Sequence, residues 1–167
     1  FVGNPWIWLV LFNTHGGQVG LLDPVARDLR ARRGLLALST SWFQWPLRGP
    51  DGEDINARFA AHEHRFGIHG GEIETSLMLA LRPEHVRMAL AQHFRSSSEQ
   101  RASQFALLGN GRSARLAWQT QYLNASGAVG NAAAATAANG SALLDAAGRA
   151  LAQLLDEIHR LPPDTLR

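Results

Sequence analysis

The sequence predicts an α/β fold with a mainly parallel sheet. An unbroken apolar run from Trp6 to Phe12 is rich in aromatic and branched side chains, which is typical of a strand buried on both faces of a parallel sheet. A helical pattern over residues 18–33 follows this run, and residues 35–41, which begin with four apolar residues, are predicted to form a second strand. Strand, helix and strand in this order indicate a β-α-β unit with a right-handed crossover.

The first helix has one apolar face, formed at helical spacing by Leu22, Val25, Ala26 and Leu29. Asp23 and Pro24 resemble an N-cap followed by proline at the first helical position, so the regular helix is expected to begin there after a looser turn. Gly34 is a suitable residue to end it.

Two further helices are predicted in the second half of the chain. The first covers residues 74–81 and is stopped by Arg82 and Pro83. The second covers residues 141–159, with Ser141 as its N-cap and a long apolar face. The polar stretch 95–108 shows no pattern that assigns it to a helix or a strand.

Length and composition suit one domain over residues 1–167, since 46% of the residues are hydrophobic. The chain has no cysteine, which excludes a disulfide framework and thiolate metal ligands. The 16 basic residues are all arginines, and their densest group, on the first helix, is read as a solvated face.

No apolar run reaches the roughly 18 residues of a membrane span. We expect a cytoplasmic protein without nucleic-acid or membrane partners, and a chain opening on Phe1 beside a core strand suggests a piece of a longer protein.

Candidate functional residues gather in two glycine turns. The first is His15-Gly16-Gly17, at the carboxyl end of the first strand, where ligands bind in open α/β sheets. Glycines there let backbone amides approach a ligand closely, although a lone histidine in such a place is also a common structural residue.

The second turn is His69-Gly70-Gly71, followed by Glu72 and Glu74 at a helix start. The two glutamates could simply complement the helix dipole. Two carboxylates and two histidines from separate loops also suit a hydrolytic site for Zn, Mn or Fe, which activates water and polarises a carbonyl. His62 and His64 are expected to be structural or surface residues.

The same turns carry a family resemblance that runs in order from Trp8 to Leu161. Residues 13–18 resemble the Asn-Gly-His-Gly-Gly-Asn signature of the creatininase (creatinine amidohydrolase) family. Residues 68–79 resemble its His-Ala-Gly-Glu-x-Glu-Thr-Ser-x-Leu-Leu signature. Further matches occur at residues 82–86, 127–130 and 135–140.

The resemblance implies a three-layer αβα fold and a homohexamer with two divalent metal ions, Zn, Mn or Fe, in each active site. It implies hydrolysis of a non-peptide or cyclic amide, with metal-activated water attacking the carbonyl. By resemblance, His15 and Glu74 match metal-site residues, His69 and Glu74 match catalytic residues, and the substrate contacts are Gly16, Gly17 and Glu72.

The chain departs from the family in two informative ways. The family's front segment, which supplies a Glu-x-His pair and a bridging aspartate to the metals, has no counterpart here, so the fold is expected to be incomplete at its N-terminus. Gly17 stands where creatininase proper has a metal-binding glutamate, which argues against creatinine as the substrate. The alternative to an amidohydrolase is a truncated, catalytically incompetent scaffold or subunit-interface protein.

Overall fold

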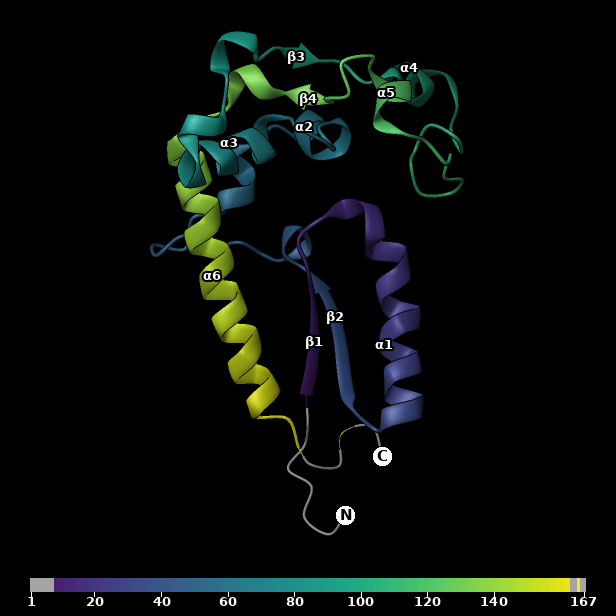
Figure 1. Ribbon diagram of the computed structural model, residues 1–167, viewed down its shortest axis with the longest axis vertical. Coiled ribbons are helices and arrows are strands. Elements are labelled where there is room, and N and C mark those ends of the chain that lie inside the picture. The colour runs from purple at the N-terminus through teal and green to yellow at the C-terminus, as the bar shows by residue number, and fades with distance from the viewer. Residues whose placement is uncertain (1–7, 163–164, 166–167) are drawn as a thin grey trace. The chain divides into compact units, whose positions relative to one another are not determined.

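The computed structural model describes residues 8–162 and residue 165 (Figure 1). Trp6 and Ile7, the first residues of the predicted strand, lie outside the described residues. The chain divides into two compact units, and each is described by itself. The first unit comprises residues 1–46 and 147–167, and the second comprises residues 47–146.

The first unit contains the predicted β-α-β element. Strand β1 (Trp8–Asn13) pairs in parallel with β2 (Leu36–Ser41), with Trp8 opposite Leu36 and Asn13 opposite Ser41. Helix α1 (Val19–Arg33) connects the two strands and packs against them (Figure 1). The predicted α/β class with a parallel sheet is therefore confirmed, whereas the three-layer arrangement stays a prediction.

Helix α1 begins earlier than the sequence indicates. A 3-10 turn over Gly16–Gln18 leads directly into the helix at Val19, so Pro24 lies inside the helix and Asp23 is not its N-cap. The Asp23 carboxylate instead pairs with Arg27 one turn later, at 2.8 Å. The predicted end is confirmed, because Gly34 has a left-handed φ of +66° and donates its N–H to the Arg30 carbonyl.

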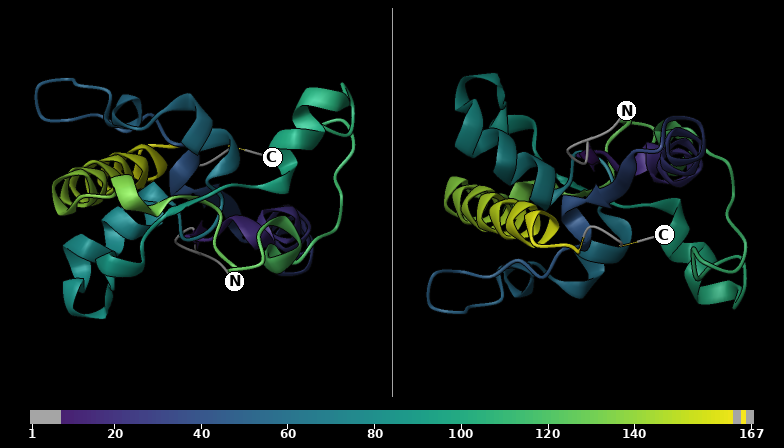
Figure 2. Two further views of the ribbon diagram at one scale, coloured as in Figure 1. Left: turned by 90° about the horizontal axis from the view of Figure 1, so that it is seen from above. Right: turned by 90° about the horizontal axis from the view of Figure 1, so that it is seen from below.

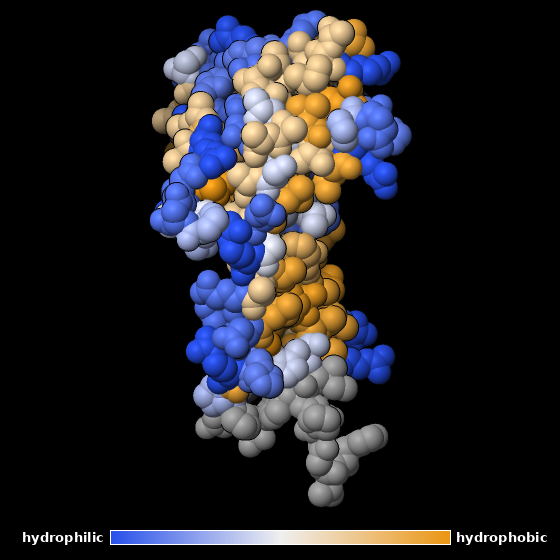
Figure 3. Space-filling model, turned by 90° about the vertical axis from the view of Figure 1, so that its left-hand side faces the viewer, coloured by the Kyte–Doolittle hydropathy of each residue, from blue (hydrophilic) through white to orange (hydrophobic). Residues whose placement is uncertain are grey.

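Burial of β1 on both faces was expected and is wrong for this structure. Residues Trp8–Leu11 are only partly buried, and Phe12 is 42% exposed with its ring stacked on Trp45. The physical reason is that β1 has a single strand partner, β2, among the described residues. Several other large apolar side chains are exposed as well, and Figure 3 shows hydrophobic patches between hydrophilic ones.

The second unit is built from short elements. Its helices are α2 (Ala61–Phe66), α3 (Glu72–Leu81), α4 (Ser97–Gln104) and α5 (Thr120–Leu123). Strands β3 (His93–Phe94) and β4 (Gly130–Asn131) pair antiparallel. The buried apolar residues of this unit include Leu47, Ile55, Phe59, Leu123, Val129 and Leu143. Between α4 and α5 the chain forms a long loop, visible in Figure 2.

Two predicted helices of the later chain are present with altered starts. Helix α3 begins at Glu72 and ends, as predicted, before Arg82 and Pro83. Helix α6 spans Ala137–His159, so Ser141 lies within it and is not its N-cap. Gly140 is buried, and a Cβ atom there would overlap the carbonyl oxygen of Ser76 in α3. The glycine therefore permits a close approach of two helices. The earlier start of α6 is capped by Thr136, whose Oγ1 accepts the N–H of Asn139 at 3.2 Å.

In the part of the chain that the structure describes, no helix has the length and apolar character needed to cross a membrane. The single domain over residues 1–167 and its incompleteness at the N-terminus stay predictions.

Candidate functional site

The first turn follows β1 and is fixed by Asn13. This side chain is 2% exposed, and its Nδ2 donates to Ser41 Oγ at 3.0 Å on the neighbouring strand. Its Oδ1 accepts the N–H of His15 at 3.1 Å. Because Asn13 and Ser41 face each other in the parallel register, the strand pair itself positions the start of the turn.

His15 caps the 3-10 turn that follows. Its Nδ1 accepts the N–H of Gly17 at 3.1 Å, while the side chain remains exposed. A neutral imidazole that accepts through Nδ1 carries its proton on Nε2. Binding a metal through Nε2 would therefore require the ring to give up the bond to Gly17.

The second turn presents His69 beside Glu74. The backbone of His69 pairs with Val129 through two hydrogen bonds of 3.3 and 2.6 Å. Gly70 has a φ of +63°, a left-handed conformation that favours glycine. The Glu74 Oε2 atom accepts the Gly70 N–H at 2.5 Å and lies 3.7 Å from His69 Nδ1. The predicted catalytic pair is thus brought together, with both side chains nearly half exposed.

A buried carboxylate that the sequence did not reveal supports this turn. Glu63 in α2 is 2% exposed, and its Oε1 accepts the N–H of Glu72 at 2.7 Å. Its Oε2 accepts the N–H of Asn131 at 2.9 Å. Helix α3 has Gly71 as its N-cap and no side-chain cap of its own, so Glu63 satisfies a free amide at that helix end from another element.

Glycines make room for the Glu63 carboxylate. A Cβ atom at Gly67 or Gly71 would overlap Glu63 Oε1, and one at Gly130 would lie 2.7 Å from it. The carboxylate therefore occupies the space left by three missing side chains. It ties α2, the second turn and β4 into one arrangement.

The two other polar residues of the motif act inside the fold. Thr75 Oγ1 donates to the Gly70 carbonyl at 3.3 Å, which adds a further restraint on the turn. Ser76 is fully buried, and its Oγ accepts the N–H of Thr136 at 3.1 Å. Neither side chain caps α3.

Glu72 lies on the side of the turn that faces Glu63. Burial raises the pKa of Glu72, the negative charge of Glu63 raises it further, and His64 partly offsets both effects. The predicted contact between Glu72 and a substrate stays a prediction.

An open depression of about 370 Å³ borders the second turn. Gly70 and Glu74 belong to its lining, together with apolar residues such as Met78 and Phe94. A mixed apolar and carboxylate surface of this kind can hold a small organic molecule with a few polar groups. His15, Gly16 and Gly17 belong to the first unit, and their convergence with His69 and Glu74 stays a prediction.

The sequence matches the model of one protein family. The family model for creatininase, described as creatinine amidohydrolase, matches residues 7–155. The chain belongs to the creatininase family. Among curated protein sequences, none matches the chain.

Solved structures with the same fold include several from this family. A protein of Bacteroides fragilis NCTC 9343, assigned as a creatinine amidohydrolase, is 26% identical to the chain, with a TM-score of 0.67. The match covers 93% of this chain and 55% of that protein. A glutamate-to-glutamine mutant of creatininase in complex with creatine is 21% identical with a TM-score of 0.62. The same kind of mutant in a Zn-Zn form is 22% identical with a TM-score of 0.61. In both cases the match covers 92% of this chain and 57% of the creatininase chain.

Glu63 is the main residue that sequence reasoning missed. A usable signal was present, because Gly67 and Gly71 follow it at four-residue intervals and leave space around one carboxylate. A glutamate between two histidines in a short polar helix nevertheless has the composition of a solvated face. The burial of Glu63 becomes evident only in the structure, where β4 lies beside its carboxylate.

Proposed function

We propose that the protein that carries this sequence is a metal-dependent amidohydrolase acting on a non-peptide or cyclic amide. The observation that carries the proposal is the pair formed by His69 and Glu74, held at 3.7 Å on a turn restrained from three sides. Membership of the creatininase family and the Zn-Zn form of a structurally similar creatininase support it.

The residue types fit a divalent metal site. His15 offers an exposed imidazole and Glu74 an accessible carboxylate, which are donors that Zn, Mn and Fe accept. Two bound metal ions would activate a water molecule and polarise the amide carbonyl. A catalytic zinc normally has three protein ligands, so these two residues alone should bind metal weakly.

His69 is proposed to move the proton of the reaction. The Glu74 carboxylate faces Nδ1, which favours a proton on that nitrogen and leaves Nε2 for the substrate. When both nitrogens are protonated, the imidazolium is stabilised by Glu74 and Nε2 can donate its proton to the departing nitrogen. Gly70, directly after His69, has a left-handed backbone conformation and adds no side chain to the turn beside the imidazole.

The substrate is proposed to be an amide other than creatinine. Gly16 and Gly17 would contact it through backbone amides, with Glu72 as a further contact, because the two glycines offer no side chains. We further propose a cytoplasmic protein that forms a homohexamer, the latter resting on the family resemblance alone.

The test compares His69→Ala with His15→Ala in the protein that carries this sequence, loaded with Zn²⁺ or Mn²⁺ and assayed on a panel of cyclic amides and formamides. His69→Ala should lower kcat by roughly 10²–10⁴-fold, the usual contribution of general acid–base catalysis, with unchanged metal content. His15→Ala should lose metal and activity together. Metal content is measured by elemental analysis on the same samples.

The two variants also identify the failures. Metal loss in His69→Ala would make that residue a ligand, and full activity would make it structural. If the wild type binds metal but hydrolyses no amide of the panel, the scaffold alternative is favoured. Separately, one or two metal ions per chain that the 167-residue chain retains after dialysis against chelator and that His15→Ala releases would contradict the expectation of weak binding by His15 and Glu74.

A further inference from the structure

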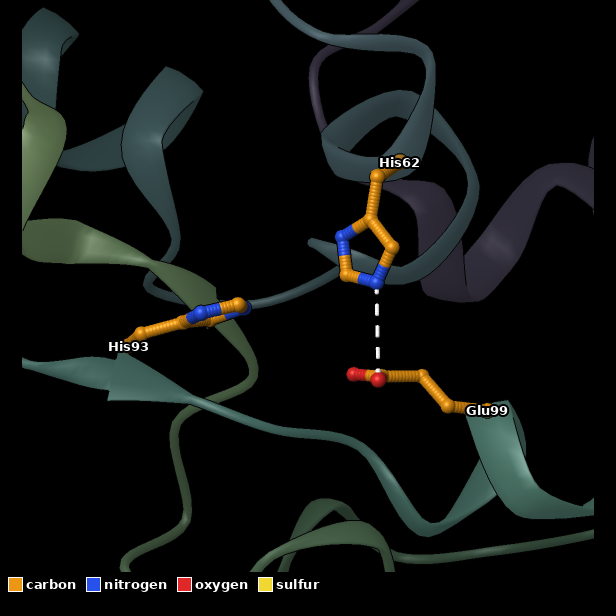
Figure 4. Close-up of side chains that lie close together, drawn as sticks. All are labelled: His62, His93 and Glu99. Carbon is orange, nitrogen blue, oxygen red and sulfur yellow. Dashed lines mark ion pairs between the residues drawn. The ribbon is translucent and has the colours of Figure 1, made fainter.

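Three side chains with metal-binding atoms meet in the second unit, and none of them belongs to the proposed amidohydrolase centre. They are His62 in α2, His93 in β3 and Glu99 in α4, and their ligand atoms all lie within 4.8 Å of one another (Figure 4). The Nε2 atom of His62 lies 3.5 Å from Glu99 Oε2. The two imidazole rings meet edge to face, with centroids 5.7 Å apart.

These atoms have nearly the spacing that a metal ion requires. Bonds of about 2.0–2.2 Å from zinc to nitrogen or oxygen place the ligand atoms of a tetrahedral site about 3.5 Å apart. The pair formed by His62 and Glu99 already has this spacing. His62 and His93 are exposed, so small side-chain rotations can bring the third ligand to the same distance.

Glu99 is held in place for such a role. Its Oε1 accepts the N–H of Ser96 at 3.1 Å as part of the capping box that begins α4. This bond directs Oε2 toward His62, and only 13% of the side chain is exposed. The capping box therefore fixes one oxygen of the carboxylate and leaves Oε2 beside His62 as the oxygen for a metal ion.

We propose that His62, His93 and Glu99 bind one divalent transition-metal ion, with Zn²⁺ the ion best matched to two imidazoles and a carboxylate. Water would complete the coordination, because an open depression of about 710 Å³ borders His62 and Glu99. The ion would connect α2 with the segment that carries β3 and α4. The site shares no residue with the proposed amidohydrolase centre and does not depend on it.

Arg95 is the competitor of the metal. Its Nε and Nη2 donate to Glu99 Oε2 at 3.1 and 2.9 Å, the same oxygen that faces His62. The Arg95 side chain is 76% exposed, and an ion pair so accessible to water contributes little. Coordination of a metal ion by two imidazoles and a carboxylate is much stronger, so Arg95 would turn away into solvent when the ion binds.

The experiment is a Zn²⁺ titration of the full chain by calorimetry after removal of metal with a chelator, together with the Tm in the presence and absence of Zn²⁺. Wild type should bind Zn²⁺ and gain Tm. His62→Ala, His93→Ala and Glu99→Gln should each weaken this binding on the order of tenfold or more and reduce the gain. Glutamine can replace glutamate in a capping box, so Glu99→Gln removes the ligand while α4 is retained.

Two further variants separate coordination from a general effect of charge. Arg95→Gln should tighten Zn²⁺ binding, whereas Arg101→Gln, on α4 and bonded to Ser97, removes a positive charge nearby without freeing Glu99. His85→Ala removes an exposed histidine outside the cluster and should leave the tight binding unchanged. Equal affinity in wild type and all three ligand variants would overturn the proposal, and so would equal tightening by Arg95→Gln and Arg101→Gln.

Discussion

The tripeptide His-Gly-Gly occurs twice in this chain, at residues 15–17 and 69–71, and the two copies are held by different interactions. In the first copy the side chain of His15 bonds to Gly17, and its backbone bonds to Asn13. All three residues lie within five positions of one another. These bonds are made by neighbours in the sequence, and the start of the turn is positioned by the bond from Asn13 to Ser41 on the adjacent strand.

The second copy depends on residues far away in the sequence. The backbone of His69 pairs with Val129, and the amide that follows the turn, that of Glu72, bonds to Glu63. The contacts with Glu74 and Thr75 are local. The difference teaches that one motif can be a local cap in one place and a junction between distant segments in another, so the two should respond differently to mutation.

Removal of the Glu63 carboxylate should give the largest effect. Glu63→Ala leaves the partly buried amides of Glu72 and Asn131 without their acceptor. Each such loss costs about 1–3 kcal/mol, so the free energy of unfolding should fall by about 3 kcal/mol, measured by urea denaturation followed by circular dichroism. The exposed Glu84→Ala should change it by less than about 0.5 kcal/mol. Equal losses in the two variants would mean that Glu63 does not hold the second turn together.

Gly71 in the second turn is closely surrounded, and Gly16 in the first turn is not, so Gly16 provides the control. A Cβ at Gly71 would overlap Glu63 Oε1 and lie 3.0 Å from Gly130 Cα, whereas a Cβ at Gly16 meets no atom within 4 Å. Gly71→Ala should therefore destabilise the chain by about 1–3 kcal/mol. Gly16→Ala should be neutral or slightly stabilising, since alanine restricts the unfolded chain. Thermal unfolding of both variants measures the difference, and similar Tm values would show that the second turn is as unconstrained as the first.

The parts of the fold that the sequence predicted are those with local signals. The apolar run of β1, the second apolar run and Gly34 between them are enough to predict the β-α-β element. The proximity of His69 and Glu74 was also within reach, because the glycine turn after His69 leads directly into the helix that carries Glu74. Even so, local signals mislead where another partner competes with them. Asp23 pairs with Arg27 and is not a cap, and Thr136, whose N–H bonds to Ser76, caps the start of α6 ahead of Ser141.

Other features could not be predicted because their cause is distant in the sequence or hidden by composition. Glu63 is buried by Asn131 and its neighbours, 68 positions away. Helix α4 was missed although Ser96 and Glu99 form a capping box, because its polar residues give no apolar face against which to judge a period. The exposure of β1 depends on how many strands lie beside it, which the strand's own sequence does not specify.

The smallest effect that we predict is a dependence on pH in the second turn. Burial and the charge of Glu63 raise the pKa of Glu72 above its ordinary value. The folded state therefore binds this proton more tightly than the unfolded state. The resulting stabilisation is complete below about pH 4.3, the ordinary glutamate value, and is lost as the pH rises through the folded pKa. Glutamine at this position carries no charge at any pH, so Glu72→Gln should gain stability relative to wild type over this interval.

The measurement is urea denaturation of wild type and Glu72→Gln at about pH 3.5 and pH 7. The difference in the free energy of unfolding should shift in favour of the variant at the higher pH. In a Glu63→Gln background this shift should shrink, because the neighbouring charge is gone, but it should persist in part because burial of Glu72 remains. A difference that is constant with pH would show that Glu72 is free of both influences. Neither burial nor the charge of Glu63 would then act on the ionisation of Glu72 in the second turn.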